Sequence, residues 1–319
     1  MLRIIKRILL YALIFCLLPA MPSHAENERL QILASVFPAF DFARTIAGET
    51  AEVKLLLPPG SESHSYEPTP QDIISIQNAD LFLYTGGESD HWIEEILASM
   101  GKNAPRTFKL MDCVELLAEQ TSKSMEHHHA HEHGEDCDHA HEAAEMDEHV
   151  WTSPRNVMLI ASSLCGVLSE LRPQNASVYH NACEVYLDEL QALDEAFRQV
   201  TEEGQRDLII FGDRFPLRYF AAAYGLHYDA AFPGCSEDSE PSVRTVISLV
   251  DTVREQKIPV IFYIEFSSRR TADILAEETG AKPLLFHSCH NVSAEEIENG
   301  ATYLKLMWQN VEALKEALR

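Results

Sequence analysis

Short apolar runs recur along the chain, separated by longer amphipathic segments. The runs predict strands at 30–38, 51–57, 80–84, 108–111, 207–211, 229–233, 258–264 and 283–286. The run at 258–264 is apolar at nearly every position, which is typical of a strand buried on both faces of a parallel sheet. Strands that alternate with helices predict parallel α/β layering.

The segments between the runs predict helices. One begins near Pro70, after a polar capping residue, and another spans 154–171. The longest spans 173–199, where apolar positions recur at spacings of three and four residues. These positions are Tyr179, Ala182, Tyr186, Leu190 and Leu193.

Residues 1–25 have the pattern of a secretory signal peptide. Three basic residues precede an apolar run, and small residues at Ser23 and Ala25 suit cleavage after Ala25. Cys16 leaves open a lipid-anchored form, although the bulky Phe15 before it is unlike a lipobox. We therefore expect an exported protein, in the periplasm or on the outer face of the cytoplasmic membrane.

Removal of this peptide changes the charge and leaves a chain of two-lobe size. It takes away three basic residues and no acidic ones, so the net charge moves from −25 to −28. Such an acidic export product is not expected to bind nucleic acid. The remaining 294 residues exceed one comfortable hydrophobic core and predict two lobes, without a transmembrane segment.

Six cysteines remain after processing, and export permits disulfides. Six cysteines allow fifteen connectivities, so the pairing cannot be deduced from the sequence. The favoured bridge joins Cys235 to Cys289, because both follow predicted strands of the second half. Cys137 is a candidate metal thiolate.

Residues 125–149 hold eight of the fifteen histidines, nine carboxylates and one cysteine. Imidazole is a good ligand for zinc, copper and nickel. The segment 122–147 has almost no apolar side chains to offset an ordering entropy of about 1–2 kcal/mol per residue, so it predicts a mobile loop. Composition indicates a flexible metal collector, with a merely solvated loop as the alternative. Its histidines are His127, His128, His129, His131, His133, His139 and His141.

Two further histidines lie in better-defined contexts. His64 follows a Pro-Pro-Gly turn at the carboxyl end of a predicted strand, where open parallel sheets place their ligands. An ordinary exposed histidine is the alternative for this position. His149 ends the acidic segment and comes just before the helix at 154–171.

Three motifs carry a family resemblance. They are the proline-glycine loop with His64, the acidic-His-x-Trp-x-Ser-Pro turn at His149, and the acidic histidine-rich segment between them, followed by shorter motifs in the second half. With them the chain resembles the zinc and manganese substrate-binding proteins of bacterial ABC importers, over essentially its whole mature length. The resemblance implies an α/β protein of two lobes, each a mainly parallel sheet flanked by helices. It places the lobes at 26–172 and 204–319, joined by one long rigid helix at 173–203.

The resemblance also implies metal ligands from both lobes. His64 and His149 are the ligands expected from the first lobe. The third ligand of relatives falls on Arg214 in this chain, and a guanidinium has no lone pair for a metal. Asp213 is the alternative ligand, unless it pairs with Arg214 or caps the next helix.

Relatives place an aspartate near the end of the last strand, where this chain has two histidines. Either His287 or His290 can replace that ligand. Glu265, at the end of a buried strand, is expected to support a ligand rather than bind the metal. Three or four imidazoles favour zinc over manganese, which prefers more oxygen ligands.

The resemblance thus implies a monomer that captures Zn(II) in an interlobe cleft and delivers it to an ABC permease and its ATPase. The chain has no phosphate-binding Gly-Lys-Ser/Thr loop of its own. A secreted zinc hydrolase is one alternative, but no His-Glu-x-x-His motif is present, so we do not expect an enzyme. A histidine-rich metal buffer without a transporter is the other.

Overall fold

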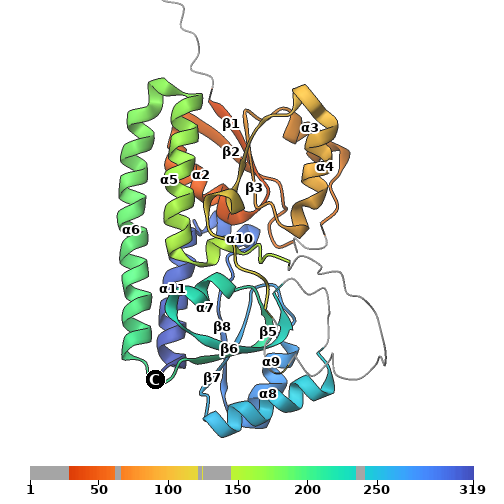
Figure 1. Cartoon of the computed structure of the whole chain (residues 1–319), viewed down its shortest axis with the longest axis vertical. Coiled ribbons are helices and arrows are strands. Elements are labelled where there is room, and N and C mark those ends of the chain that lie inside the picture. The colour runs from red at the N-terminus through yellow and green to blue at the C-terminus, as the bar shows by residue number, and fades with distance from the viewer. Residues whose placement is uncertain (1–28, 62–65, 121–123, 125–144, 235–240) are drawn as a thin grey trace, which may run out of the picture.

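The computed structural model describes residues 29–61, 66–120, 124, 145–234 and 241–319 and contains two parallel sheets, one in each lobe (Figure 1). The first sheet has the strand order β2 (Ala51–Leu55), β1 (Leu30–Ala34), β3 (Leu81–Tyr84) and β4 (Arg106–Lys109). The second repeats this order with β6 (His227–Pro233), β5 (Leu208–Phe215), β7 (Val260–Tyr263) and β8 (Lys282–Leu285). All of these strand pairs are parallel, which confirms the predicted fold class.

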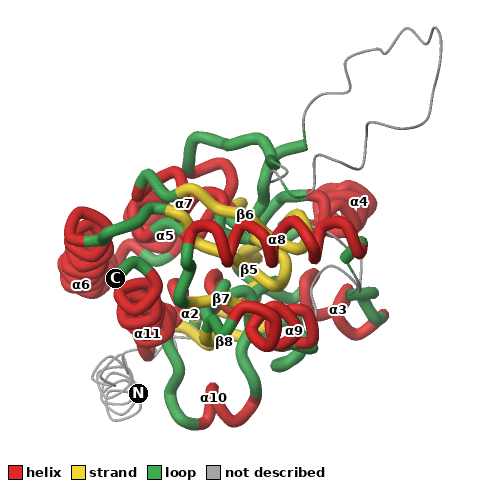
Figure 2. The backbone as a smooth tube through the Cα atoms, turned by 90° about the horizontal axis from the view of Figure 1, so that it is seen from below, coloured by secondary structure: helices red, strands yellow, loops and turns green. Residues whose placement is uncertain are grey.

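Helices flank both sheets. Those of the first lobe are α2 (Phe37–Ala47), α3 (Pro70–Gln77), α4 (His91–Met100) and α5 (Pro154–Leu171). Those of the second lobe are α7 (Arg218–Tyr224), α8 (Val243–Gln256), α9 (Arg270–Thr279), α10 (Ala294–Glu298) and α11 (Tyr303–Ala317). Figure 2 shows α8 and α9 on one side of the second sheet and α11 on the other. None of the described helices has the length and apolar character needed to cross a membrane.

One helix, α6 (Ala176–Glu203), runs along both lobes (Figure 1). A 3-10 turn, Pro173–Asn175, precedes it within the segment for which a linking helix is expected. Its buried residues recur every three or four positions, as an amphipathic helix requires. They include Tyr179, Cys183, Tyr186, Leu190, Leu193 and Phe197. Through this face α6 packs on α2 and α5 of the first lobe and on α7 and α11 of the second.

The two lobes share one hydrophobic cluster. Phe42 of α2 packs edge-on against Tyr303 of α11, with ring centroids 5.4 Å apart. The Tyr303 hydroxyl donates a 2.8 Å hydrogen bond to the carbonyl of Trp151, and the backbone N–H of Tyr303 donates to the buried carboxylate of Asp41. The lobes are therefore held together by a continuous core as well as by α6.

The predicted end of the strand at residue 211 is wrong, because β5 continues to Phe215. Its pairing with β6 shifts register between Phe211 and Arg214, which accommodates one extra residue without ending the strand. Gly212 lies within this irregularity, where a Cβ atom would come 2.5 Å from the Cα of Ala272. The strand continues because Phe215 still has a partner, stacking on Tyr228 with ring centroids 3.6 Å apart.

The favoured disulfide between Cys235 and Cys289 stays a prediction. Cys289 is a free thiol with no exposed surface, and burial raises its pKa. Its expected partner, Cys235, lies outside the described residues, as does Cys137.

Candidate metal site between the lobes

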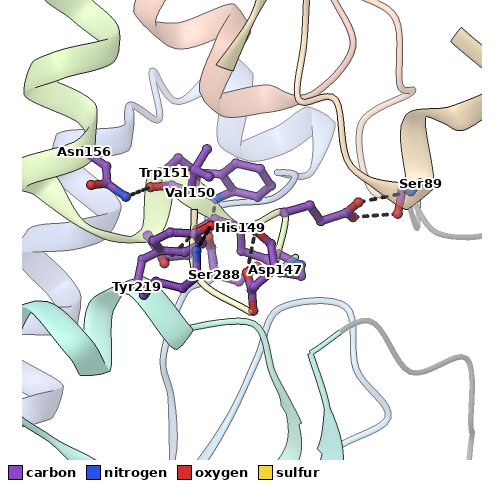
Figure 3. A network of polar contacts seen from close by, with 11 residues as sticks. Ser89, Asp147, His149, Val150, Trp151, Asn156, Tyr219 and Ser288 are labelled. Atoms are coloured by element: carbon purple, nitrogen blue, oxygen red, sulfur yellow. Dashed lines mark hydrogen bonds and ion pairs between the residues drawn. The ribbon is translucent and has the colours of Figure 1, made fainter. Parts of the chain in front are cut away.

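His149 is buried and held by a neighbouring carboxylate. It lies just before α5 and has no exposed surface. The Asp147 carboxylate accepts one hydrogen bond from the backbone N–H of His149 at 2.8 Å and contacts its ring Nδ1 at 3.1 Å (Figure 3). A proton on Nδ1 that faces this carboxylate leaves the lone pair on Nε2, the tautomer that binds a metal through Nε2.

His290 brings a second imidazole to the same place from the other lobe. Its ring centroid lies 5.5 Å from that of His149 and 4.9 Å from that of Trp151. The Trp151 indole in turn donates from Nε1 to the carbonyl of Ser288 at 2.9 Å (Figure 3). The segments that carry these two imidazoles are thus joined across the lobe boundary.

Glu265 holds the segment that carries His290. Its carboxylate accepts hydrogen bonds from the backbone N–H of Ser288 at 2.8 Å, the Ser288 hydroxyl at 2.6 Å and the backbone N–H of His290 at 3.1 Å. Three donors on one carboxylate fix the course of the chain after β8. The predicted supporting residue therefore contacts the backbone of a predicted ligand.

A pocket with about 380 Å³ of empty space, partly open to solvent, lies beside the two imidazoles. Both lobes contribute to its wall, which includes Ser61, His149, Arg214, Glu265 and His290. The lobes are closely tied at its edge, since Asn291 Nδ2 donates to the carbonyls of Pro58 and Ser61 at 2.9 Å each. Carboxyl ends of strands from both sheets meet here, as expected for ligand sites in parallel α/β folds.

A neighbouring pocket in the first lobe is lined by two buried acids and by His290. The Glu148 carboxylate accepts hydrogen bonds from the Ser89 backbone at 3.0 Å and its hydroxyl at 2.6 Å. Asp90 accepts from the backbone N–H groups of Thr85 and Gly86, yet burial raises the pKa of Asp90 to about 7. The Glu148 carboxylate, next to His149 in the chain, adds negative potential that attracts a cation.

Two other predicted ligands are held elsewhere. The ring Nε2 of His287 lies 3.2 Å from Gln309 Oε1 of α11, and its backbone N–H donates to Asn310. The Asp213 carboxylate accepts from the backbone N–H groups of Arg214 and Ile264, and burial raises its pKa. Neither residue lines the pocket beside His149 and His290.

The described residues do not by themselves contain a complete metal shell. No three His, Cys, Asp or Glu side chains among them are grouped so that they could hold a metal ion. His64 lies outside the described residues, as do His127, His128, His129, His131, His133, His139 and His141. The residues on either side of the His64 segment are described, and both line these pockets: Ser61 beside His149, and Tyr66 in the neighbouring one.

A family model described as "Zinc-uptake complex component A periplasmic" matches residues 32–317. The chain belongs to this family. The high-affinity zinc uptake system protein ZnuA of Bacillus subtilis is 32% identical over 300 residues, which cover 92% of this chain and 89% of that protein. The zinc-binding lipoprotein AdcA of Streptococcus pneumoniae is 30% identical over 291 residues, 91% of this chain. The chain spans about half the length of AdcA, because the match covers 56% of that relative.

Solved structures show the same fold. The metal-dependent lipoprotein YcdH from Bacillus subtilis matches with a TM-score of 0.75 and 29% identity, over 91% of this chain and 99% of that one. The Zn(II)-bound ZnuA-like domain of Streptococcus pneumoniae AdcA matches with a TM-score of 0.74 and 27% identity, over 91% and 99%. The family is described as periplasmic, in agreement with the predicted export; residues 1–28, with Cys16, lie outside the described part.

In this member of the zinc-uptake family, the base of the histidine-rich segment is an ordered stem. Glu119 and Asp147 donate their backbone N–H groups to the carbonyls of Glu145 and Leu117, both at 2.9 Å. The Tyr219 hydroxyl accepts from the Leu117 N–H at 3.2 Å and donates to the Asp147 carbonyl at 2.8 Å. The predicted mobile loop at 122–147 therefore extends too far, because its last three residues are paired.

The other side of the stem is anchored on the second lobe. Ser124 is buried, and its hydroxyl donates to the Asp229 carboxylate at 2.6 Å. The polar composition of this segment predicts a loop. Composition alone does not show that Ser124 has a buried hydrogen-bond acceptor on the other lobe. The role of Asp147 was missed for a similar reason, although its spacing of two residues from His149 was a usable signal.

Proposed function

We propose that this chain captures Zn(II) between its two lobes and delivers it to the permease and ATPase of an ABC importer. The observation that carries the proposal is the meeting of His149 and His290, from different lobes, with ring centroids 5.5 Å apart. Two imidazoles on one tetrahedral zinc have ring centres about 5 Å apart, since zinc–nitrogen bonds measure about 2.0–2.1 Å. The relatives' names and the Zn(II)-bound AdcA domain support zinc as the cargo, ahead of Mn(II).

We assign His64 as the third imidazole. Its support is the placement of Ser61 and Tyr66, which bracket the segment and line the pockets that His290 also lines. Three neutral imidazoles match the preference of zinc for nitrogen ligands. Because Arg214 lines the same pocket and cannot bind a metal, the fourth position is assigned to water or to a carboxylate of the wall.

The remaining predicted residues receive supporting roles in this proposal. His287 contacts Gln309 and Asp213 accepts backbone N–H groups, so we place neither of them on the metal. Glu265 fixes the backbone of His290 and so limits where its ring can lie. The histidines between residues 127 and 141 act as weak auxiliary sites that raise the zinc concentration near the pocket.

Delivery requires the two lobes to separate slightly. The hydrogen bond from Trp151 to Ser288 and the bonds from Asn291 to Pro58 and Ser61 cross the boundary beside the pocket. A permease that breaks these bonds moves His290 away from His149 and weakens the shell. The continuous helix α6 limits this movement, and the proposal needs neither a second copy of the chain nor any catalytic step.

Zinc titration of the exported chain against a chelator of known affinity tests this proposal. We expect one tight site and several weak ones in the wild type. Loss of a residue that only supports a metal ligand typically lowers metal affinity by about 10- to 100-fold. His149→Ala and His290→Ala should each lower the zinc affinity of the tight site by more than this. The double variant His64→Ala with His149→Ala should abolish it.

The matched controls are His91→Ala and His227→Ala, which remove exposed histidines of α4 and β6. Both should leave the tight site unchanged. Wild-type affinity in the His149→Ala and His290→Ala variants would contradict the site assignment, provided that both variants unfold at the wild-type temperature.

A further inference from the structure

Two thiols face each other between α5 and α6, away from the pocket. Cys165 of α5 and Cys183 of α6 are both buried, 3% and 5% exposed, and both belong to the shared hydrophobic cluster. Each cysteine contacts the helix of the other: the Cys183 thiol donates to the carbonyl of Ala161 on α5 at 3.7 Å, and the Cys165 sulfur lies 3.3 Å from Nδ1 of His180 on α6. The two helices form an antiparallel hairpin closed by a short connection (Figure 1).

We propose that Cys165 and Cys183 are the site of an intramolecular disulfide that closes the α5–α6 hairpin after export. The oxidant is a disulfide donor, either a thiol–disulfide oxidase or a low-molecular-weight disulfide. Two protein thiols and one donor disulfide give one protein disulfide and two donor thiols, so atoms and electrons balance. This proposal does not rest on zinc binding.

His180 supplies a proton acceptor for the first step. Its ring Nδ1 lies 3.3 Å from the Cys165 sulfur, one turn before Cys183 on α6, and the residue is exposed. The Cys165 thiol transfers its proton to this nitrogen, and the thiolate attacks the donor disulfide. The departing donor thiolate takes the proton back from the imidazolium and leaves as the first donor thiol. Cys183 then attacks the Cys165 sulfur of the mixed disulfide, loses its proton to the departing thiolate, and releases the second donor thiol.

The order of attack follows from the surroundings of each sulfur. Burial, together with the neighbouring Cys165 thiol, raises the pKa of Cys183, so Cys183 is a poor first nucleophile. Cys165 has the imidazole beside it and Cys183 does not share that contact. Because thiolate is the attacking species, the first bond to the donor forms at Cys165.

A redox role fits these thiols better than a metal role. Two cysteines and one histidine could suggest a soft-metal site, but no group of three such side chains within the described part is arranged to hold a metal ion. Within the described residues, the two other cysteines, Cys113 and Cys289, contact no second thiol. An exported protein is exposed to oxidising conditions in which a close pair of thiols can be converted to a disulfide.

The disulfide would link two helices that pack against much of the hydrophobic core. The helix α6 runs along both lobes, and α5 begins five residues after His149. Closing this loop restricts the unfolded chain, so the oxidised protein should unfold at a temperature roughly 5 °C or more above that of the reduced protein. The effect belongs to stability, and zinc stoichiometry should be equal in both forms.

Peptide mapping of the full exported chain tests the proposal. The protein is incubated with glutathione disulfide, denatured with an alkylating reagent and digested without reduction. We expect a Cys165–Cys183 linked peptide, with Cys113 and Cys289 alkylated. Recovery of Cys165 and Cys183 as separate alkylated peptides, or of either linked to another cysteine, would overturn the proposal.

Two sets of variants sharpen the result. Cys183→Ser should remove the difference in unfolding temperature between oxidised and reduced protein, whereas Cys113→Ser should retain it. His180→Asn should slow oxidation several-fold without changing the linked product, while His227→Asn, at another exposed histidine, should not slow it. An unchanged rate in His180→Asn would overturn the assigned proton acceptor, and a retained temperature difference in Cys183→Ser would overturn the disulfide.

Discussion

The indole Nε1 of Trp151 donates a 2.9 Å hydrogen bond to the backbone carbonyl of Ser288, across the boundary between the lobes. Trp151 lies two residues after His149, and Ser288 lies two residues before His290. The bond therefore joins the two segments that carry the proposed imidazole ligands. Each segment is fixed again by a carboxylate, Asp147 in the first lobe and Glu265 in the second.

Asp147→Asn should weaken zinc binding by about 10- to 100-fold, because the neutral amide no longer favours the Nδ1–H tautomer of His149. Chelator competition measures the affinity. Asp207→Asn makes the same chemical change at an exposed position and should bind as tightly as the wild type. Equal affinity in the two variants would show that Asp147 does not orient the ligand.

Glu265→Gln should lower the free energy of unfolding by about 1–3 kcal/mol, since the amide can accept fewer of the three hydrogen bonds and presents N–H groups to other donors. Zinc affinity should fall with it, because His290 loses its backbone support. Urea unfolding measures the first effect. Glu255→Gln, on the exposed face of α8, is the control and should change neither quantity.

Arg214→His should raise zinc affinity. The substitution removes a positive charge from the wall of the pocket and adds an imidazole at the position where relatives are expected to carry a ligand. Arg214→Gln removes the charge alone, so the difference between the two variants isolates the added ligand. By calorimetry, zinc affinity should be highest in Arg214→His, intermediate in Arg214→Gln and lowest in the wild type. If Arg214→His binds zinc no more tightly than Arg214→Gln, residue 214 does not reach the metal.

The free energy of unfolding should fall as the pH rises from about 4 to about 7, because the carboxyl group of Asp90 is buried. Burial raises the pKa of its carboxyl from 3.8 to about 7, so over this range the folded state keeps a proton that the unfolded state loses. The free energy of unfolding then decreases by up to about 1.4 kcal/mol per pH unit, and the contribution is constant above the folded pKa. Asp90→Asn should flatten this slope in urea unfolding, whereas Asp251→Asn, exposed on α8, should keep it.

Replacing residues 125–144 with a short Gly-Ser linker should preserve the tight zinc site and remove the weak ones. The described stem ends at Glu145, so this deletion spares the pairing of 117–119 with 145–147. A deletion extended through residue 147 removes Asp147 and should weaken the tight site as well. Calorimetry of both variants checks this division, and loss of the tight site in the shorter deletion would contradict it.

The alternation of strands and helices could be predicted because a strand buried on both faces needs apolar residues throughout, and this need is visible in 81–84 and 260–263. The continuation of β5 through Asp213 could not be predicted from the sequence. A glycine followed by two charged residues favours a turn locally, and only the pairing of Arg214 and Phe215 with β6 keeps the strand extended.

The sequence by itself determined the two-lobed α/β fold, the acidic exported character and the histidines from which a site could be built, because these follow from residue type and spacing. Only the tertiary structure distinguished His290, beside His149, from His287, on α11, since both lie on an irregular segment where no periodicity assigns a direction. The deciding contacts come from Glu265 and Gln309, residues 25 and 22 positions away. Contacts so distant along the chain depend on the completed packing of both lobes.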